Sequence, residues 1–469
     1  MSLRLFNTLS RELEEFRPLE PGRAGVYACG PTVYNFAHIG NLRTYVSEDL
    51  LVRTLRELGY EVRHVMNVTD VGHLTGDADQ GEDKMLKSAR EQGQSVWQIA
   101  EFYTRAFFED CAGLNILCPT VVCRATDHIA DMIALIRRLE VRGFAYRAGG
   151  NVYFDIGRLP DYGRLTGQNL EDLKSGARVE VDADKRNPLD FVLWFTRSKF
   201  EHQAMLWDSP WGRGYPGWHI ECSAMSMKYL GEQFDIHCGG VDHVPVHHTN
   251  EIAQSEAATG RKWVNYWLHA EFLVLAREKM AKSSGGFLTL GSLKEKGFEP
   301  LDYRYLCLGA HYRSQLQFSY EALEAARSGR RALQERLGRL LAEAGPAEAD
   351  QEPGPEREYV QAFLGELCED LNSPRGLAAL QNLLRDTGLP PAARVRGALA
   401  MNRVLGLSLE AVEAPREEPL DPEAQALIEE RARARHNREW ARADSLRQEL
   451  ARRVIQVEDT PDGVRWKKL

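Results

Sequence analysis

Apolar runs alternate with an amphipathic stretch near the start of the chain. An apolar run at Gly25–Gly30 predicts a short buried strand, and a loop bounded by Gly and Pro then leads to a predicted helix at about Leu42–Leu58. The next apolar run, Glu61–Val68, predicts a second strand. The order strand, helix, strand indicates a βαβ unit, and therefore a parallel sheet with a right-handed crossover.

This α/β pattern is interrupted and later resumes. Short strands and charged, turn-rich segments between about Asp110 and Gly214 predict an insertion. A helix at His219–Leu230 and an apolar strand at Phe234–Gly240 follow, so one nucleotide-type fold is predicted in two halves. After Tyr320, leucines at helical spacing predict a helical region, and stretches rich in Pro and acid predict a linker to a small final module.

Composition limits the class of protein. A chain of 469 residues is too long for one hydrophobic core, and its 43% hydrophobic content can supply several. It has no run of about 18 uncharged apolar residues, and its start lacks the apolar block of a signal peptide. We therefore expect a cytoplasmic protein without membrane segments, with its eight cysteines reduced. The net charge of −9 argues against a generally basic nucleic-acid coat but allows a local basic patch.

Four residues indicate a metal site. His247 and Glu251 stand four positions apart, so an imidazole and a carboxylate share one face of a helix, although a solvated helix face often carries the same spacing. Cys29 ends the first strand and Cys222 opens the helix of the second half, and both positions border the crevice where open parallel sheets bind ligands. Either cysteine also suits a small buried apolar position. Together the four offer the donors that zinc prefers, beside a substrate site.

Two short motifs indicate a nucleotide site. His38 in HIGN stands at the start of a helix, where free N–H groups and the helix dipole favour a phosphate, although a histidine there can also merely cap the helix. Lys279 and Lys282 in KMAKS lie in a short Gly/Ser-bounded loop, which either brings positive charge to a leaving pyrophosphate or is an ordinary charged turn.

HIGN (His38–Asn41) and KMAKS (Lys279–Ser283) together resemble the HIGH and KMSKS signatures of class I aminoacyl-tRNA synthetases. Seven segments spread over nearly the whole chain are similar to the cysteinyl-tRNA synthetase family within that class: YACGPTVYNFAHIGN, MNVTDVG, KRNPLDFVLW, SPWGRGYPGWHIECSAM, FDIH, HHTNEIAQSE and HYRSQL. Two signature positions differ, because Asn41 replaces histidine and Ala281 replaces serine. Asn41 can still donate a hydrogen bond, and both lysines remain.

The resemblance implies a monomeric enzyme that forms cysteinyl-adenylate from L-cysteine and Mg²⁺-ATP and transfers cysteine to the 3′ end of tRNA-Cys. It implies one Zn²⁺ per chain on Cys29, Cys222, His247 and Glu251, completed by the substrate thiolate. The hydroxyl of serine is a harder and poorer ligand for Zn²⁺ than a thiolate. The discrimination of cysteine from serine can therefore exceed the free-energy difference of about 1–3 kcal/mol that a methylene in a pocket supplies. The implied catalytic residues are His38, Lys279 and Lys282; the ATP-binding residues are His38, Gly40, Asn41 and Lys282; the amino-acid pocket is Thr69, Trp218, His219 and His237.

Arginines concentrate in the final module. From Leu427 onward, Arg431, Arg435, Arg438, Arg442 and Lys467 are expected to meet phosphates, with Trp440 and Trp466 stacking on bases. A solvated arginine-rich helix is the alternative. The resemblance implies an anticodon-binding module with contacts from Arg435, Trp440, Asp444, Arg447 and Asp459.

The predicted fold class is α/β. A Rossmann-type parallel-sheet catalytic domain is expected at residues 1–110 and 215–300, split by a connective insertion at 111–214. It is followed by a stem-contact region at 301–320, just after the KMSKS-like loop at 279–283, then by a helical bundle at 321–410, a linker at 411–420 and the anticodon-binding module at 421–469. Two other functions stay open. One is a cysteine:amino-sugar ligase of the same fold, which would not need the final module. The other is a non-catalytic tRNA-binding or zinc-sensing relative, which the retained lysines and candidate zinc ligands disfavour.

Overall fold

The computed structural model of the protein divides into two compact units, Met1–Glu413 and Ala414–Leu469. It describes residues 1–71, 74–76, 80–167, 184–197, 205–275, 288–344, 354–414, 422–460 and 463–468. In these ranges, no helix combines the length and the apolar composition needed to span a membrane.

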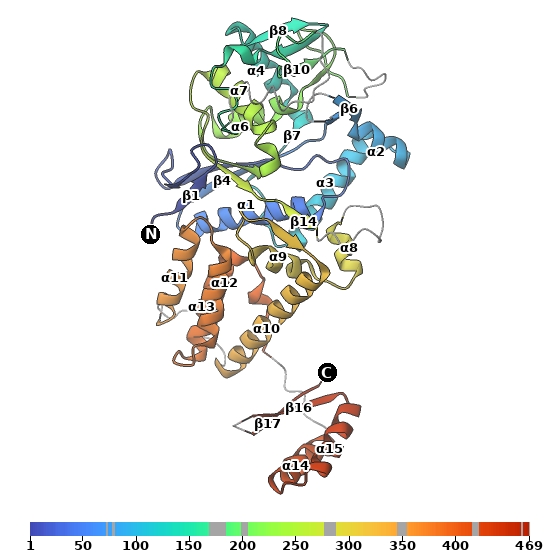
Figure 1. Ribbon diagram of the computed structural model, residues 1–469, viewed down its shortest axis with the longest axis vertical. Helices are drawn as coiled ribbons and strands as arrows, with labels where there is room; N and C mark the ends of the chain where they lie inside the picture. Colours follow the sequence, from blue (N-terminus) through green and yellow to red (C-terminus); the bar gives the residue numbers. More distant parts are fainter. Residues whose placement is uncertain are drawn as a thin grey trace. The chain divides into compact units, whose positions relative to one another are not determined.

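A five-stranded parallel sheet forms the centre of the described part of the first unit. Its strand order is β13 (Val264–Ala270), β12 (Phe234–Gly240), β3 (Arg23–Ala28), β4 (Glu61–Val68) and β7 (Val121–Arg124). Helix α1 (Ile39–Glu57) packs on one face of the sheet, and α6 (Trp218–Leu230) packs on the other, beside α7 (His247–Thr259) (Figure 1). The predicted α/β fold with a parallel sheet is confirmed.

Alternation along β3 sends its side chains to two different cores. Val26 and Ala28 point into the core shared with α1 and the helical region, whereas Tyr27 and Cys29 belong to the core shared with α6. At Gly30 an added Cβ would lie 1.7 Å from the carbonyl oxygen of Asn67, so only glycine lets the chain leave the strand beside β4. The sequence thereby directs Cys29 toward α6.

The segment between the two halves contributes to two sheets. β7 falls inside the range 111–214 that the sequence assigned to the insertion, yet it is an edge strand of the parallel sheet. A separate antiparallel sheet has the strand order β11 (Tyr215–Pro216), β10 (Phe191–Phe195), β9 (Asn151–Phe154) and β8 (Ala145–Ala148). At Gly217 an added Cβ would lie 2.0 Å from the carbonyl oxygen of Val192, so this glycine lets the antiparallel sheet pack against the start of α6.

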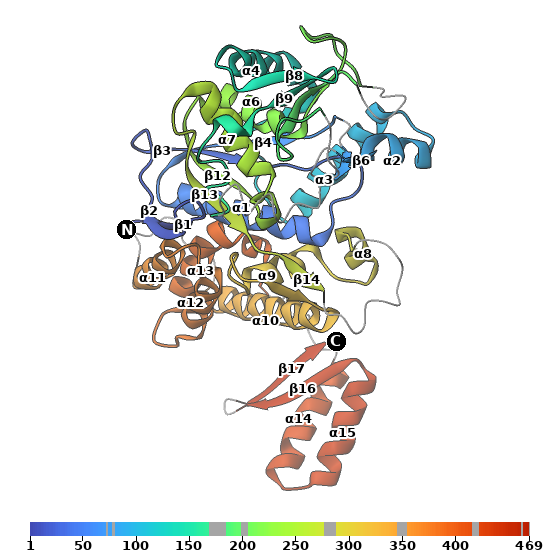
Figure 2. The same cartoon turned by 45° about the horizontal axis from the view of Figure 1, so that its top comes forward.

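The remaining elements of the first unit surround these sheets. They are β1 (Arg4–Asn7), β2 (Glu12–Glu15), β5 (Leu74–Gly76), β6 (Gln80–Asp83), α2 (Lys84–Gln92), α3 (Val96–Gly113), η1 (Ala125–His128), α4 (Ile129–Val141), η2 (Ile156–Arg158), η3 (Val241–His243), β14 (Leu273–Leu275), α8 (Leu290–Glu295), α9 (Pro300–Leu308), β15 (Leu316–Phe318), α10 (Tyr320–Ala344), α11 (Arg357–Cys368), α12 (Ser373–Arg385), α13 (Pro391–Leu405) and η4 (Leu409–Ala411). The helices from α9 to α13 pack together below α1 in Figure 2, which confirms the predicted helical region.

The second unit is a helical hairpin with a β-ribbon. It contains α14 (Pro422–His436), α15 (Trp440–Arg452), β16 (Ile455–Thr460) and β17 (Gly463–Lys468). Ala424, Ile428, Leu450, Ile455 and Val457 form its own small core.

One buried carboxyl group on α1 is unpaired within the described part of the first unit. Glu48 is 4% exposed, and neither of its oxygens has a hydrogen-bond partner among the residues that the structure describes. It lines a small cavity together with Cys238 and Tyr312. Burial raises the pKa of Glu48 well above its ordinary value, because a charge there would lose its hydration without compensation.

We therefore expect Glu48→Gln to change how stability depends on pH. Because folding raises the pKa of the Glu48 carboxyl, its favourable contribution to stability is complete below the unfolded pKa and is lost as pH rises toward the folded pKa. The loss is about 1.4 kcal/mol for each pH unit between the two values. Melting temperatures should be similar for wild type and variant near pH 4 and higher for the variant at pH 8. A constant difference at both pH values would contradict this, and Glu61→Gln, at an exposed position, is the control.

Candidate metal centre and nucleotide site

The four predicted ligands come from three elements. Cys29 follows β3, Cys222 lies in the second turn of α6, and His247 and Glu251 lie on the first turns of α7. One sulfur from each cysteine, one nitrogen from His247 and one oxygen from Glu251 all lie within 4.8 Å of one another, and all four residues are buried. The structure therefore brings together the set that the sequence proposed, from positions up to 222 residues apart in the chain.

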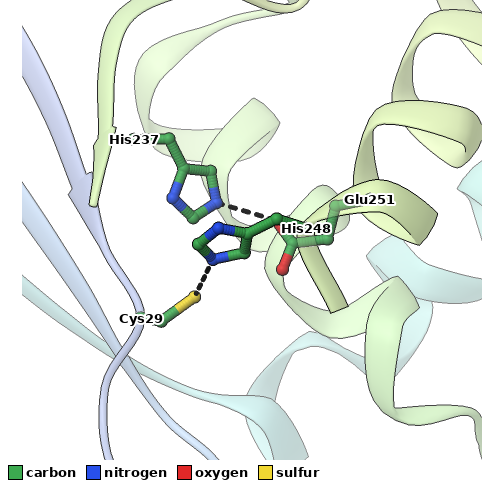
Figure 3. A group of neighbouring side chains, drawn as sticks. All are labelled: Cys29, His237, His248 and Glu251. Carbon is green, nitrogen blue, oxygen red and sulfur yellow. Dashed lines mark hydrogen bonds and ion pairs between the residues drawn. The ribbon is translucent and has the colours of Figure 1, made fainter. Parts of the chain in front are cut away.

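A second set of possible ligands shares two of these residues. Cys29, His237, His248 and Glu251 also place their ligand atoms within 4.8 Å of one another (Figure 3). The Sγ of Cys29 is 3.2 Å from Nε2 of His248, and Nε2 of His237 is 2.7 Å from an Oε of Glu251. The first set offers two sulfurs, the second only one.

A hydrogen bond at one nitrogen and an ion pair at the other orient the His247 ring. Its Nδ1 lies 3.0 Å from Nδ1 of His219, and its Nε2 lies 2.6 Å from Oε1 of Glu251. Trp218 stacks on the same ring, with centroids 4.3 Å apart. A ligand histidine is usually held in this way through its other nitrogen, which fixes the orientation of the ring.

The electrostatics of the first set favour a positive charge at its centre. Burial alone would lower the pKa of His247, but the carboxylate of Glu251 and the sulfur of Cys222 raise it to about 10. Burial would raise the pKa of Glu251, but His247 and His237 hold it well below its ordinary value. The hydrogen bond with Cys29 lowers the pKa of Cys222, whereas burial raises the pKa of Cys29. A divalent cation would supply the positive charge that these groups favour.

The donor chemistry fits zinc among the common divalent ions. Two thiols, an imidazole and a carboxylate are typical ligands of Zn²⁺, whereas Mg²⁺ and Ca²⁺ prefer oxygen ligands.

His38 caps α1, which is one of the two roles that the sequence allowed for it. Its Nδ1 accepts a hydrogen bond from the backbone N–H of Asn41 (3.1 Å), and its own N–H donates to Oδ1 of Asn41 (3.3 Å), which completes a capping box. Asn41, where the family signature has histidine, therefore has a structural role at the helix start. At Gly40 a Cβ would lie 3.0 Å from Nδ1 of His38, so the lack of a side chain leaves room for that ring. Lys279, Ala281 and Lys282 lie outside the described residues.

Three of the four predicted pocket residues contact the candidate ligands: Trp218 and His219 contact His247, and His237 contacts Glu251. Thr69, at the end of β4, instead donates a hydrogen bond to Glu221 of α6 (3.0 Å).

Sequence reasoning missed a chain of polar residues behind Cys29. Nδ1 of His248 lies 2.8 Å from Nε2 of His269, whose Nδ1 lies 2.7 Å from Oγ1 of Thr8. His269 and Gly239 are partners across β13 and β12, so His269 reaches the site only through strand pairing. The local sequence pointed to this hydrogen-bonded row of residues only through the doublet His247–His248 at the start of α7.

The predicted anticodon contacts lie on the helical hairpin of the second unit. Arg435, Trp440, Asp444 and Arg447 are exposed, and the guanidinium of Arg435 lies 5.7 Å from the Trp440 ring centroid. Asp459 lies on β16, and its side chain is not among those described. Arg431, expected to meet phosphates, is only 2% exposed, because it faces the inside of the hairpin; that expectation was wrong. Arg442 is exposed and pairs with Glu430 (2.6 Å).

Solved structures share this fold. Methionyl-tRNA synthetase of Mycobacterium tuberculosis, in complex with methionyl-adenylate, aligns with 84% of this chain and 92% of its own, at a TM-score of 0.55 and 16% identity. Leucyl-tRNA synthetase AgnB2 of Agrobacterium radiobacter K84, in a ternary complex with tRNA, aligns with 85% of each chain at a TM-score of 0.55 and 12% identity. These likenesses concern the fold alone.

Residues 15–328 match the family of class I (C) tRNA synthetase catalytic domains, so the fold and the site define a class I aminoacyl-tRNA synthetase. Residues 417–466 match the cysteinyl-tRNA ligase anticodon binding domain. The cysteine–tRNA ligase of Treponema denticola is 54% identical over the whole of both chains, and cysteine–tRNA ligase 1 of Burkholderia lata is 50% identical over 99% of this chain and 97% of its own. The chain belongs to the cysteinyl-tRNA synthetase family.

Proposed function

We propose that this protein is a cysteine–tRNA ligase, acting as a cytoplasmic monomer, which activates L-cysteine with Mg²⁺-ATP and transfers it to tRNA-Cys. The observation that carries the proposal is the buried cluster of Cys29, Cys222, His247 and Glu251. It lies at the carboxyl edge of the parallel sheet, and only eight residues separate Cys29 from His38 at the start of α1. An amino acid recognised at this cluster would therefore be close to a nucleotide phosphate at the helix N-terminus.

Cysteine selection is proposed to depend on this cluster. When bound by these four residues, Zn²⁺ would supply a soft Lewis acid that prefers a thiolate over a hydroxyl. His219 holds the ring of His247 through Nδ1, and Trp218 covers the face of that ring. We assign Thr69, Trp218, His219 and His237 to the surroundings of the amino acid.

The adenylate step is proposed to need no side-chain nucleophile. A carboxylate oxygen of cysteine attacks the α-phosphorus of ATP, and pyrophosphate leaves; the terminal ribose hydroxyl of the tRNA then attacks the adenylate carbonyl, and AMP leaves. The N-terminus of α1, with His38, is aimed at the developing phosphate charge, and Lys279 and Lys282 are proposed to neutralise the leaving pyrophosphate. Positioning and electrostatics would then account for catalysis.

The second unit is proposed to read the anticodon. Trp440 is 56% exposed, and Arg435 lies over its ring, which makes a surface on which an unpaired base can stack. Arg447, Asp444 and Asp459 are assigned to base edges and phosphates nearby. The amino-sugar ligase would not need this module.

Two assays on the full-length wild type test the proposal. We expect cysteine-dependent ATP–pyrophosphate exchange and charging of tRNA-Cys, with kcat/KM for cysteine exceeding that for serine by more than about 200-fold, the limit for a methylene-sized difference. Exchange without charging would favour the amino-sugar ligase. No exchange by zinc-loaded protein would contradict the proposal and favour a non-catalytic relative.

A further inference from the structure

Two exposed aromatic rings lie beside the loop that leads to His38. Phe36, in this loop, is 46% exposed, and Phe102, on α3 (labelled in Figure 1), is 39% exposed. Their ring centroids are 5.9 Å apart in an edge-to-face arrangement. We call the surface formed by these two rings the Phe36–Phe102 face.

The face has a rigid base. Tyr103, beneath it, is 6% exposed, and its ring lies 5.1 Å from Phe36 and 5.0 Å from Phe102, again edge to face. Tyr103 belongs to a buried cluster with Val33 and Ile99. Rings mounted on a packed base lose little conformational freedom when a ligand covers them, and large exposed aromatic groups commonly mark binding surfaces.

The charges around the face favour stacking over phosphate binding. The guanidinium of Arg105 lies 6.0 Å from the Phe102 centroid and is 4.0 Å from Glu109. The neighbouring Glu101 pairs with Arg124 at 2.8 Å. Cations and anions are thus paired locally, so the exposed ring faces are the main means of recognition here. Such rings stack on bases largely regardless of sequence.

We propose that the Phe36–Phe102 face is a stacking platform for the unpaired bases at the 3′ end of the tRNA. The inference rests on the proposed function, in which the terminal ribose must reach the adenylate at the start of α1. Phe36 stands two residues before His38, so a strand that ends at the adenylate passes close to this face. Unpaired bases expose the flat surfaces that aromatic rings stack against.

Trp97 offers a matched control on the same helix. It is 50% exposed, as open as the proposed platform, but precedes Phe102 by five positions. At about 100° per residue this places the two side chains about 140° apart around α3. Trp97→Ala therefore removes an exposed ring of similar character from a different side of the helix.

The test compares the binding of intact tRNA-Cys with that of a transcript lacking the unpaired 3′-terminal nucleotides, for wild type, Phe102→Ala, Phe102→Trp and Trp97→Ala. Phe102→Ala should weaken binding of the intact tRNA by about 5- to 150-fold, the range for one base–aromatic stack, and leave binding of the truncated tRNA unchanged. Phe102→Trp should bind the intact tRNA like wild type, because it keeps a stacking face, and so should Trp97→Ala.

Several outcomes would overturn the inference: equal effects of Phe102→Ala on both transcripts, no effect on either, or a change in oligomeric state, which would indicate that a second copy of the chain covers the face. A loss of pyrophosphate exchange in Phe102→Ala would also overturn it, because exchange needs no tRNA and the face would then serve the adenylate site or the fold. If the wild type itself shows no exchange, the proposed function fails, and the inference fails with it.

Discussion

Replacing Cys222 by alanine is expected to abolish both zinc binding and cysteine-dependent pyrophosphate exchange. The substitution removes one of the two sulfurs of the first ligand set and leaves a buried carboxylate, imidazole and thiol without it. Loss of one ligand from a four-ligand site removes most of its metal affinity, and in the proposed function recognition of the substrate thiol depends on that metal. We expect less than about a tenth of the wild-type zinc content and a fall in exchange of about 1,000-fold or more, since about 4 kcal/mol corresponds to that factor.

Two control variants make this result specific. Cys238→Ala removes another buried thiol, next to His237 on β12, but Cys238 belongs to neither ligand set, so this variant should keep its zinc. His248→Ala removes a member of the second set only. If His248→Ala loses zinc while Cys222→Ala keeps it, the ion is held by Cys29, His237, His248 and Glu251, and our assignment is wrong.

His38 is expected to contribute to catalysis beyond its role as a helix cap, so His38→Asn should slow pyrophosphate exchange nearly as much as His38→Ala. Removing one group that stabilises transition-state charge costs about 100- to 1,000-fold in kcat. Asparagine is itself a good N-cap, so the two variants should differ in stability by about 1 kcal/mol, with alanine the less stable.

Measured kcat and melting temperature for the two variants separate the roles. A His38→Asn variant with wild-type kcat would show that His38 is only a cap, the structural interpretation that its hydrogen bond with Asn41 allows. Asn372→Ala, at the N-cap of α12, is a matched control: it removes a capping side chain in the helical region and should lower stability without a loss of this size in kcat.

How far the fold follows from the sequence differs between elements. The strands at Glu61–Val68 and Phe234–Gly240 are found where they were predicted, because each is an apolar run with clear ends. The first strand begins two residues earlier than predicted, since Arg23 and Ala24 pair with Glu61 and Val62 of β4, and such pairing is tertiary. The hydrophobic pattern placed the start of α1 near Leu42, whereas the helix begins at Ile39, directly after its N-cap His38, as the HIGN motif predicted.

In the candidate site, too, some residues could be placed from local sequence patterns and others only from tertiary contacts. His247 and Glu251 could be paired from helical spacing, and Cys29 could be directed to the crevice as the residue after a parallel strand. His269 could not be predicted, because it meets His248 only through the pairing of β13 with β12. Glu221, which accepts a hydrogen bond from Thr69, could not be predicted either, because its burial on α6 depends on the packing of that helix against the sheet. The residues that could not be predicted are therefore those whose place in the site depends on contacts between segments distant in the sequence.

The central claim is that Cys29 and Cys222 hold a zinc ion with His247 and Glu251 and that the substrate thiolate binds the same ion. X-ray absorption at the zinc edge of the purified protein tests it most directly. We predict two sulfur ligands at about 2.3 Å and a third when cysteine is added, with no such change for serine. One sulfur with two nitrogen ligands, or a sulfur count that cysteine does not raise, would contradict the account.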